Sequence, residues 1–179
     1  MQILNKLIRF YQHLFWSYQK QAQHEGVIMG NNNYIGSHFW DSEPYLITIG
    51  NDCAITENTK IYTHGGARVA RNIYPNFDVF GKVVLGNRVY VGAGAMIMPG
   101  VTIGDNVLIA SGSIVTKSIP SNVVVAGNPA KYICTLDEYI EKNRPYNTDT
   151  KALDSNSKKK FLLNLPDEKF VKKGFIQTP

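Results

Sequence analysis

Residues 83–115 read VVLGNRVYVGAGAMIMPGVTIGDNVLIASGSIV, and this stretch repeats with a period of six residues. An aliphatic residue returns at every sixth position, at Leu85, Val91, Ile97, Ile103, Ile109 and Val115, and the same spacing occurs earlier at Ile49, Ile55 and Ile61. Two positions before each member of the later run stands a second series, Val83, Val89, Ala95, Val101, Val107 and Ser113. An α-helix repeats every 3.6 residues and a strand every two, so neither alone explains a period of six.

A coil of short flat strands explains the period. Each hexad forms one face of a turn, its aliphatic side chain points inward, and Gly or Asn adopts the positive φ needed at the corner between faces. Successive turns then stack at the ~4.8 Å spacing of paired strands, with like residues above like. One hexad cannot bury its aliphatic residue alone, whereas a stack of hexads can. The sequence therefore predicts a mainly β protein built as a parallel β-helix of hexapeptide repeats.

The repeat is interrupted twice, and both interruptions carry polar side chains. The segment Ser37–Tyr45 departs from the hexad and contains His38, Asp41 and Glu43. A longer loop is predicted over residues 62–82. Segments that leave a rigid repeat scaffold are where such proteins place function, so we expect the site at these two interruptions.

The two ends of the chain lack the hexad. Residues 1–24 show apolar side chains at helical spacing, which predicts one amphipathic helix, packed on the first coil or lying on a membrane surface. After the coil, a short helix is predicted over residues 136–143, a polar linker over 146–160 and an apolar tail beyond it. The predicted parts are a helix (1–26), a β-helix domain (27–133) and a C-terminal helix, linker and helical tail (134–179).

The composition excludes several classes of protein. The net charge of +5 comes largely from lysines near the C-terminus, and the body lacks the aromatic and basic pattern of nucleic-acid binding. No run of about 20 apolar residues is present, and the first residues do not resemble a signal peptide. Cys53 and Cys134 lie far apart with no metal-ligand spacing, which is typical of free thiols in a reducing compartment. We therefore expect a cytoplasmic protein without a metal.

The stretch from Met29 to Ile133 resembles the hexapeptide-repeat acyltransferases. The segments that are similar to the maltose and galactoside acetyltransferases are Pro99–Asn106, Gly112–Pro120 and Gly127–Lys131. In the long loop, Thr63-His64-Gly65 and Phe80-Gly81 most resemble the acetyltransferases of capsule and lipopolysaccharide synthesis. The resemblance implies a left-handed coil and transfer of an acetyl group from acetyl-CoA to a hydroxyl of a sugar or polysaccharide precursor.

A thioester donor is already activated, so acetyl transfer needs little more than a base for the hydroxyl and a donor for the oxyanion. Histidine suits the role of the base because it titrates near neutral pH. The resemblance identifies His64 as this base. Asp41, Glu43 and Asp52 are the candidates to orient its ring, and His38 is a candidate contact of the acceptor together with Asp41 and Glu43.

The resemblance also implies a donor site for acetyl-CoA between the subunits of a homotrimer. Its residues would be Tyr90, Ala93, Ser111, Gly112, Thr116, Lys117 and Lys131. The backbone N–H of Ala93 would face the thioester oxygen, the small residues at Ser111-Gly112 would let the pantetheine approach, and the lysines would contact phosphate.

Three alternatives compete with this interpretation. A γ-type carbonic anhydrase shares the coil, but it needs three histidines around one metal, and only His38 and His64 lie in the coil region. A non-catalytic β-helix scaffold would have no reason to carry His64 together with the donor pattern. An acetyltransferase acting on a small non-sugar acceptor, such as an antibiotic, stays open at this point.

Overall fold

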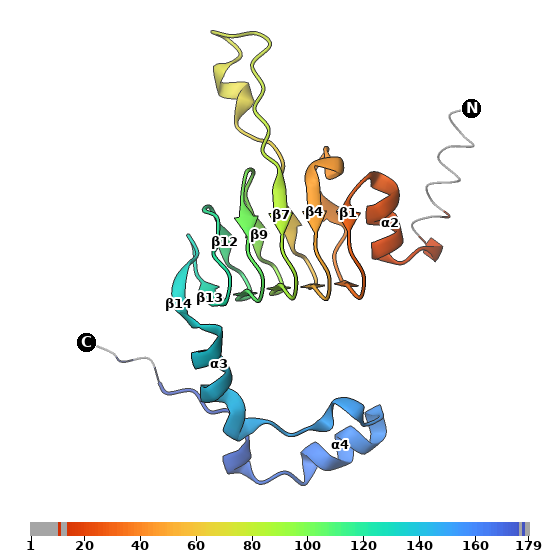
Figure 1. Cartoon of the computed structure of the whole chain (residues 1–179), viewed down its shortest axis with the longest axis vertical. Helices are drawn as coiled ribbons and strands as arrows, with labels where there is room; N and C mark the ends of the chain where they lie inside the picture. The colour runs from red at the N-terminus through yellow and green to blue at the C-terminus, as the bar shows by residue number, and fades with distance from the viewer. Residues whose placement is uncertain (1–10, 12–13, 176, 178–179) are drawn as a thin grey trace. The chain divides into compact units, whose positions relative to one another are not determined.

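The computed structural model describes residue 11, residues 14–175 and residue 177. Two compact units divide the chain, residues 1–136 and residues 137–179. The first unit contains the coil, and the second contains short helices (Figure 1).

The coil is a left-handed parallel β-helix with three flat faces. Face A contains β1 (Ile28–Met29), β4 (Ile47–Ile49), β7 (Val83–Leu85) and β10 (Thr102–Ile103). Face B contains β2 (Tyr34–Ile35), β5 (Ala54–Ile55), β8 (Tyr90–Val91), β11 (Leu108–Ile109), β13 (Val123–Ala126) and β14 (Lys131–Thr135). Face C contains β3 (Phe39–Trp40), β6 (Lys60–Ile61), β9 (Met96–Ile97) and β12 (Ile114–Val115). The chain visits A, B and C in turn, and only the last pair, β13 with β14, is antiparallel.

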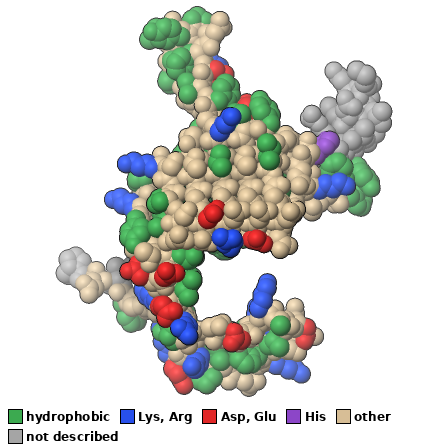
Figure 2. All heavy atoms as spheres, in the orientation of Figure 1, with side chains coloured by type: hydrophobic (Ala, Val, Ile, Leu, Met, Phe, Trp, Pro, Cys, Tyr) green, Lys and Arg blue, Asp and Glu red, His purple; other side chains and the backbone are tan. Residues whose placement is uncertain are grey.

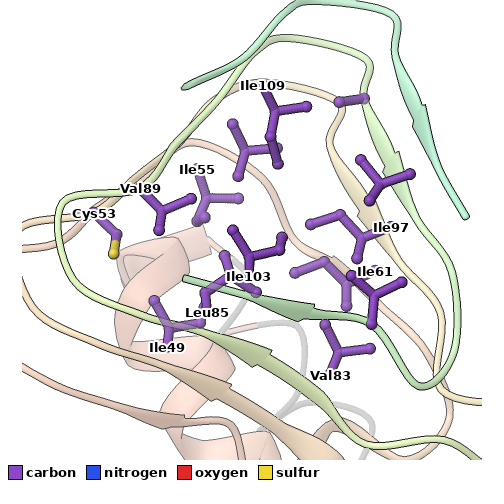
Figure 3. Close-up of a cluster of buried hydrophobic side chains, with 14 of the residues drawn as sticks. Ile49, Cys53, Ile55, Ile61, Val83, Leu85, Val89, Ile97, Ile103 and Ile109 are labelled. Atoms are coloured by element: carbon purple, nitrogen blue, oxygen red, sulfur yellow. The ribbon is translucent and has the colours of Figure 1, made fainter. Parts of the chain in front are cut away.

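The predicted inward ladders are confirmed. Every member of both hexad series from Ile49 to Val115 is buried. Figure 3 shows aliphatic side chains from all three faces, among them Ile55, Ile61 and Ile103, pointing toward one another in the centre of the coil. The core therefore fills the interior of the prism, and its residues belong to turns that are far apart in the sequence.

The corners differ from the expectation in one respect. The glycine directly after the aliphatic residue does not carry the positive φ, which falls two residues later, at Asp52 and Arg88 for example. Position 50 instead requires glycine because the neighbouring turn lies too close to leave room for a side chain. A Cβ atom there would lie 2.4 Å from the carbonyl oxygen of Gly86 on the next turn. The glycine directly after the aliphatic residue thus permits close stacking. The positive φ of the corners falls on polar residues and on later glycines, among them Asn106, Gly94 and Gly112, as the predicted use of Gly or Asn requires.

The N-terminal prediction of one uninterrupted helix is wrong at Ser17. This residue is extended (φ −60°, ψ 152°) and caps α2 (Tyr18–Glu25) by accepting a hydrogen bond from the Lys20 N–H. Only Ala22 of α2 is buried, while Leu14 and Phe15, members of the predicted apolar stripe, are exposed. The rest of the predicted helix, residues 1–10, 12 and 13, lies outside the described residues.

The second unit begins with α3 (Leu136–Asn143), which matches the predicted helix. The predicted linker differs from the structure, because α4 (Ser155–Leu163) occupies its second half. Asp154 caps this helix by accepting hydrogen bonds from the N–H groups of Asn156 and Ser157. Short 3₁₀ turns complete the description: η1 (Pro44–Leu46), η2 (Ala67–Ala70), η3 (Arg144–Tyr146), η4 (Thr150–Ala152) and η5 (Asp167–Lys169). Within the part of the chain that the structure describes, no helix has the length and apolar character needed to cross a membrane.

The long loop leaves the coil between β6 and β7 and extends away from it (Figure 1). An antiparallel bridge between His64 and Phe80 closes its base. The predicted protruding loop is therefore present, and His64 stands at its base.

Candidate active site

His64 lies where two consecutive turns of the coil meet at one corner. It follows β6 on face C, and β3 pairs with β6 so that Phe39 faces Lys60 and Trp40 faces Ile61. This register places the residues that follow β3 beside the residues that follow β6. Asp41 and Glu43 thereby approach His64, although they precede it by 23 and 21 residues.

Asp41 holds the backbone of the turn that carries His64. Its Oδ2 atom accepts hydrogen bonds from the backbone N–H groups of Thr63 (2.7 Å) and His64 (3.1 Å). Burial raises the pKa of Asp41, but hydrogen bonds from the backbone N–H groups of Thr63, Ser42 and His64 outweigh burial and hold this pKa below its ordinary value. The carboxylate is therefore ionised and fixes the turn.

Glu43 faces the imidazole ring. Its Oε2 atom lies 2.8 Å from His64 Nδ1 and accepts a hydrogen bond from the Thr63 hydroxyl at 2.9 Å. Asp41 Oδ2 lies 3.1 Å from the same ring nitrogen. Because a carboxylate only accepts hydrogen bonds, Nδ1 carries the proton, and in the neutral ring the lone pair is on Nε2. The two carboxylates thus select the tautomer that can act as a base through Nε2.

Two further residues complete the surroundings of His64. The Thr63 side chain is fully buried and lies between the two carboxylates, 3.3 Å from Asp41 and 2.9 Å from Glu43. The Phe80 ring comes from the far end of the long loop, with its centroid 5.8 Å from that of His64. No role was predicted for either residue. Their signal in the sequence is that they stand at the two ends of the loop, within the two motifs, Thr63-His64-Gly65 and Phe80-Gly81, that carry the resemblance there.

Asp41, Glu43 and His64 also present ligand atoms within 4.8 Å of one another, a spacing at which a cation can bind. The same three residues are already in contact, since His64 Nδ1 lies 2.8 Å from Glu43 Oε2 and 3.1 Å from Asp41 Oδ2. The prediction that the protein uses no metal stays a prediction. Asp52, the third candidate to orient the ring, lies on another corner, where it accepts a hydrogen bond from the Asn32 side chain.

The predicted donor residues lie on later turns, at two corners. Ala93, Ser111 and Gly112 share the corner between faces B and C, where the Gly112 N–H donates to the Ala93 carbonyl at 2.9 Å. Tyr90 is exposed on β8 of face B. Thr116 and Lys117 follow β12, at the end of face C, and Lys131 begins β14. All seven of the predicted donor residues are exposed.

His38, the remaining predicted contact of the acceptor, directly precedes β3, whereas Asp41 directly follows it. Its ring stacks on Phe39 at 4.5 Å between centroids, at the opposite end of β3 from Asp41. The structure therefore brings Asp41, Glu43 and His64 together, and places His38 on the same strand of the coil but at its other corner.

Comparison with known proteins agrees with this architecture. Residues 82–117 match the family described as bacterial transferase hexapeptide (six repeats). The chain is 48% identical to Protein CapG of Staphylococcus aureus over 78% of its own length and 83% of that protein. It is 37% identical to galactoside O-acetyltransferase of Escherichia coli (strain K12), over 61% of its own length and 57% of that relative.

Solved structures agree too. A maltose O-acetyltransferase from Clostridium difficile 630 superposes with a TM-score of 0.57 and 28% identity, covering 75% of this chain and 84% of that one. A galactoside acetyltransferase in complex with coenzyme A gives a TM-score of 0.51 and 25% identity, covering 69% and 72% of the two chains. The repeat, the coil and these relatives lead to one conclusion: the chain belongs to the hexapeptide-repeat transferase family and is an acetyltransferase.

Proposed function

We propose that the protein transfers the acetyl group of acetyl-CoA directly to a hydroxyl of a sugar or polysaccharide precursor, with His64 as the general base. The observation that carries the proposal is the contact of 2.8 Å between His64 Nδ1 and Glu43, because it fixes the tautomer with a basic Nε2. A structural histidine at the start of an exposed loop would not need two carboxylates on one ring nitrogen.

The reaction follows from this tautomer. Nε2 of His64 takes the proton of the acceptor hydroxyl while the hydroxyl oxygen attacks the thioester carbonyl. The negative charge that develops on the carbonyl oxygen is stabilised by a hydrogen-bond donor, for which we propose the backbone N–H of Ala93, an exposed residue. The C–S bond then breaks, and the coenzyme A thiolate leaves with the proton that His64 received. Asp41 and Glu43 stabilise the imidazolium formed between these steps and act as positioning residues.

The donor assignment rests on the exposed residues of the later turns and on the relative that was solved with coenzyme A. Ser111-Gly112 is a corner at which a Cβ atom on Gly112 would meet nothing within 4 Å, so there is room for a ligand beside the backbone. Lys117 and Lys131 are exposed cations on the last turns, and we assign them to the phosphates of coenzyme A.

We further propose that the active unit is a homotrimer with the site between subunits. Ala93 lies at the start of face C and His64 at its end, so about six residues of extended chain, ~20 Å, separate the two corners within one chain. The corner that carries Ala93 is called the donor corner. A single chain therefore does not place the base against this corner, but the donor corner of a second chain can reach it. The exposed apolar residues of the long loop, such as Val69 and Ile73, offer a surface for that second chain (Figure 2).

The acceptor class rests on the relatives, which are named as galactoside and maltose O-acetyltransferases. The test is release of coenzyme A from acetyl-CoA with a panel of galactosides, maltose and acidic sugars, with mass spectrometry of the sugar product. We expect His64→Ala to lower kcat by ~10²–10⁴-fold with little change in coenzyme A binding. His24→Ala, at the end of α2, is the matched control and should keep full activity. Wild-type activity in His64→Ala would overturn the proposed mechanism.

Complementation tests the assembly separately. A mixture of His64→Ala chains with Ala93→Trp chains should recover part of the activity, because some interfaces then pair an intact base with an intact donor corner. A proven mixed trimer without activity would place the whole site within one chain, and an active monomer in analytical ultracentrifugation would contradict the trimer.

A further inference from the structure

A cavity of about 420 Å³ lies at the corner between faces B and C of the first two turns, away from the His64 cluster. Its walls carry three aromatic rings, one imidazole and two polar side chains: Tyr18, Tyr34, Phe39, His38, Glu57 and Asn58. No function assigned above uses this cavity, apart from the proposed contact of His38 with the acceptor.

The rings are exposed and arranged as a platform. His38 stacks on Phe39 with 26° between the ring planes, and Tyr18 lies 5.0 Å from His38. Tyr34 is 57% exposed, Phe39 42% and Tyr18 38%. Large rings are the side chains that gain most from burial, so several exposed rings around one hollow are typical of a binding surface.

The polar residues of the cavity narrow the class of ligand. Glu57 and Asn58 lie on the turn beside the rings, where Asn58 adopts φ 57°, and supply carboxylate and amide groups for hydrogen bonds. A ligand that fits both must present apolar C–H faces to the rings and hydroxyl groups to the polar edge. Pyranose sugars have this composition, since the ring carries C–H bonds on its faces and hydroxyls around its rim.

A second hollow of about 190 Å³ lies next to this cavity and includes Asp41 of the catalytic cluster in its wall. It is lined by Phe39, which is shared with the first cavity, and by Trp40, Asp41, Lys60, Ile61 and Tyr62. Lys60 Nζ lies 5.5 Å from the centroid of the Phe39 ring. At the far end, Asp41 contacts His64. Because Phe39 lines both hollows, the two lie next to each other along β3, and together they are called the path below. Three steps of extended chain from His38 to Asp41 span ~10 Å.

We propose that this path binds sugar residues adjacent to the one that is acetylated, so that the acceptor is an oligosaccharide or polysaccharide chain rather than a single sugar. The inference rests on the proposed function, because it extends the acceptor site of the same base. Phe39 and Tyr34 stack on neighbouring sugar rings, and Glu57 and Asn58 bind their hydroxyl groups.

The experiment compares acceptor ladders. The specificity constant kcat/KM is measured for glucose, maltose and maltotriose, and for galactose and its di- and trisaccharide. For the ladder that is acetylated, we expect kcat/KM to rise about tenfold from the monosaccharide to the trisaccharide, the contribution of one or two stacked rings. In Phe39→Ala and Tyr34→Ala this ratio should fall toward one. Ile28→Ala, an exposed residue on face A of the same turn, should keep the wild-type ratio.

Other results overturn the proposal. A wild-type ratio near one would exclude a subsite, and an equal loss on short and long acceptors in Phe39→Ala would assign the ring to folding or to the catalytic cluster. A lowered melting temperature of Phe39→Ala would show that this variant folds poorly. The ratio of kcat/KM between trisaccharide and monosaccharide is then measured with Phe39→Leu instead. If the wild type acetylates neither ladder, the acceptor class of the proposed function fails. Ligand-observed NMR with maltotriose and galactotriose then decides the subsite: binding that Phe39→Ala abolishes supports it, and no binding to the wild type refutes it.

Discussion

Replacing Glu43 by Gln removes one charge from the catalytic cluster while keeping the shape of the side chain. In the structure, Glu43 Oε2 lies 2.8 Å from His64 Nδ1, and the side chains of both residues are partly shielded from water. Glutamine can still accept a hydrogen bond from Nδ1–H, but the bond is no longer assisted by charge. A hydrogen bond to a charged group contributes about 1.5–3 kcal/mol, so its loss predicts a fall of about 10- to 100-fold in kcat.

The second carboxylate of the cluster limits this loss of kcat. Asp41 Oδ2, at 3.1 Å from the same nitrogen, retains part of the electrostatic stabilisation in Glu43→Gln. The double variant Asp41→Asn/Glu43→Gln should therefore lose more activity than either single variant and approach the residual rate of His64→Ala. The Glu43 carboxylate contacts the side chains of His64 and Thr63, whereas Asp41 accepts hydrogen bonds from two backbone N–H groups. Replacing Glu43 should therefore change the melting temperature less than Asp41→Asn does.

The assay is steady-state release of coenzyme A at saturating acceptor, with Glu25→Gln at the exposed end of α2 as the control for a lost carboxylate. We expect KM for acetyl-CoA to stay within about twofold, because the contact stabilises the imidazolium formed during reaction rather than the bound donor. Unchanged kcat in Glu43→Gln, with activity lost in His64→Ala, would refute the role of Glu43. A kcat loss matched by a large fall in melting temperature would show a structural role only.

Three further predictions follow from the geometry. The pKa of Asp41 is lowered in the folded protein, so its contribution to stability is present above the ordinary aspartate pKa and is lost on acidification. The difference in melting temperature between wild type and Asp41→Asn should therefore shrink between about pH 5 and pH 3. A difference that stays constant over this range would contradict a lowered pKa. Gly50→Ala places a Cβ atom 2.4 Å from a backbone oxygen, so it should cost about 1–3 kcal/mol and lower the melting temperature by ~4–10 °C, whereas Gly65→Ala, with nothing within 4 Å, should leave it nearly unchanged. Lys117→Glu should raise KM for acetyl-CoA much more than it lowers kcat, and the rise in KM should be smaller with acetyl-dephospho-coenzyme A as the donor. An unchanged KM would remove Lys117 from the donor site.

The structure also changes the interpretation of the N-terminal segment. Apolar side chains at helical spacing predicted one helix, packed on the coil or lying on a membrane surface, but Leu14 and Phe15 are exposed and Ser17 caps a new helix. Helical periodicity reports that a face is apolar, and it does not report what covers that face. Ser17 is a strong N-cap residue inside a helical pattern, and this local signal decided where α2 begins.

The sequence by itself determined the coil, because each turn can bury its aliphatic residues only against equivalent positions of the next turn. This requirement produces a repeat of six residues that can be read from the sequence. It also indicated His64, which stands where the period stops and matches the motif of the family. Only the tertiary structure decided which groups act on His64. Asp41 and Glu43 belong to the previous turn, and their approach depends on the register of β3 against β6. That register is set by stacking of the whole coil, since the segment Ser37–Tyr45 itself breaks the hexad and gives no local rule that aligns it.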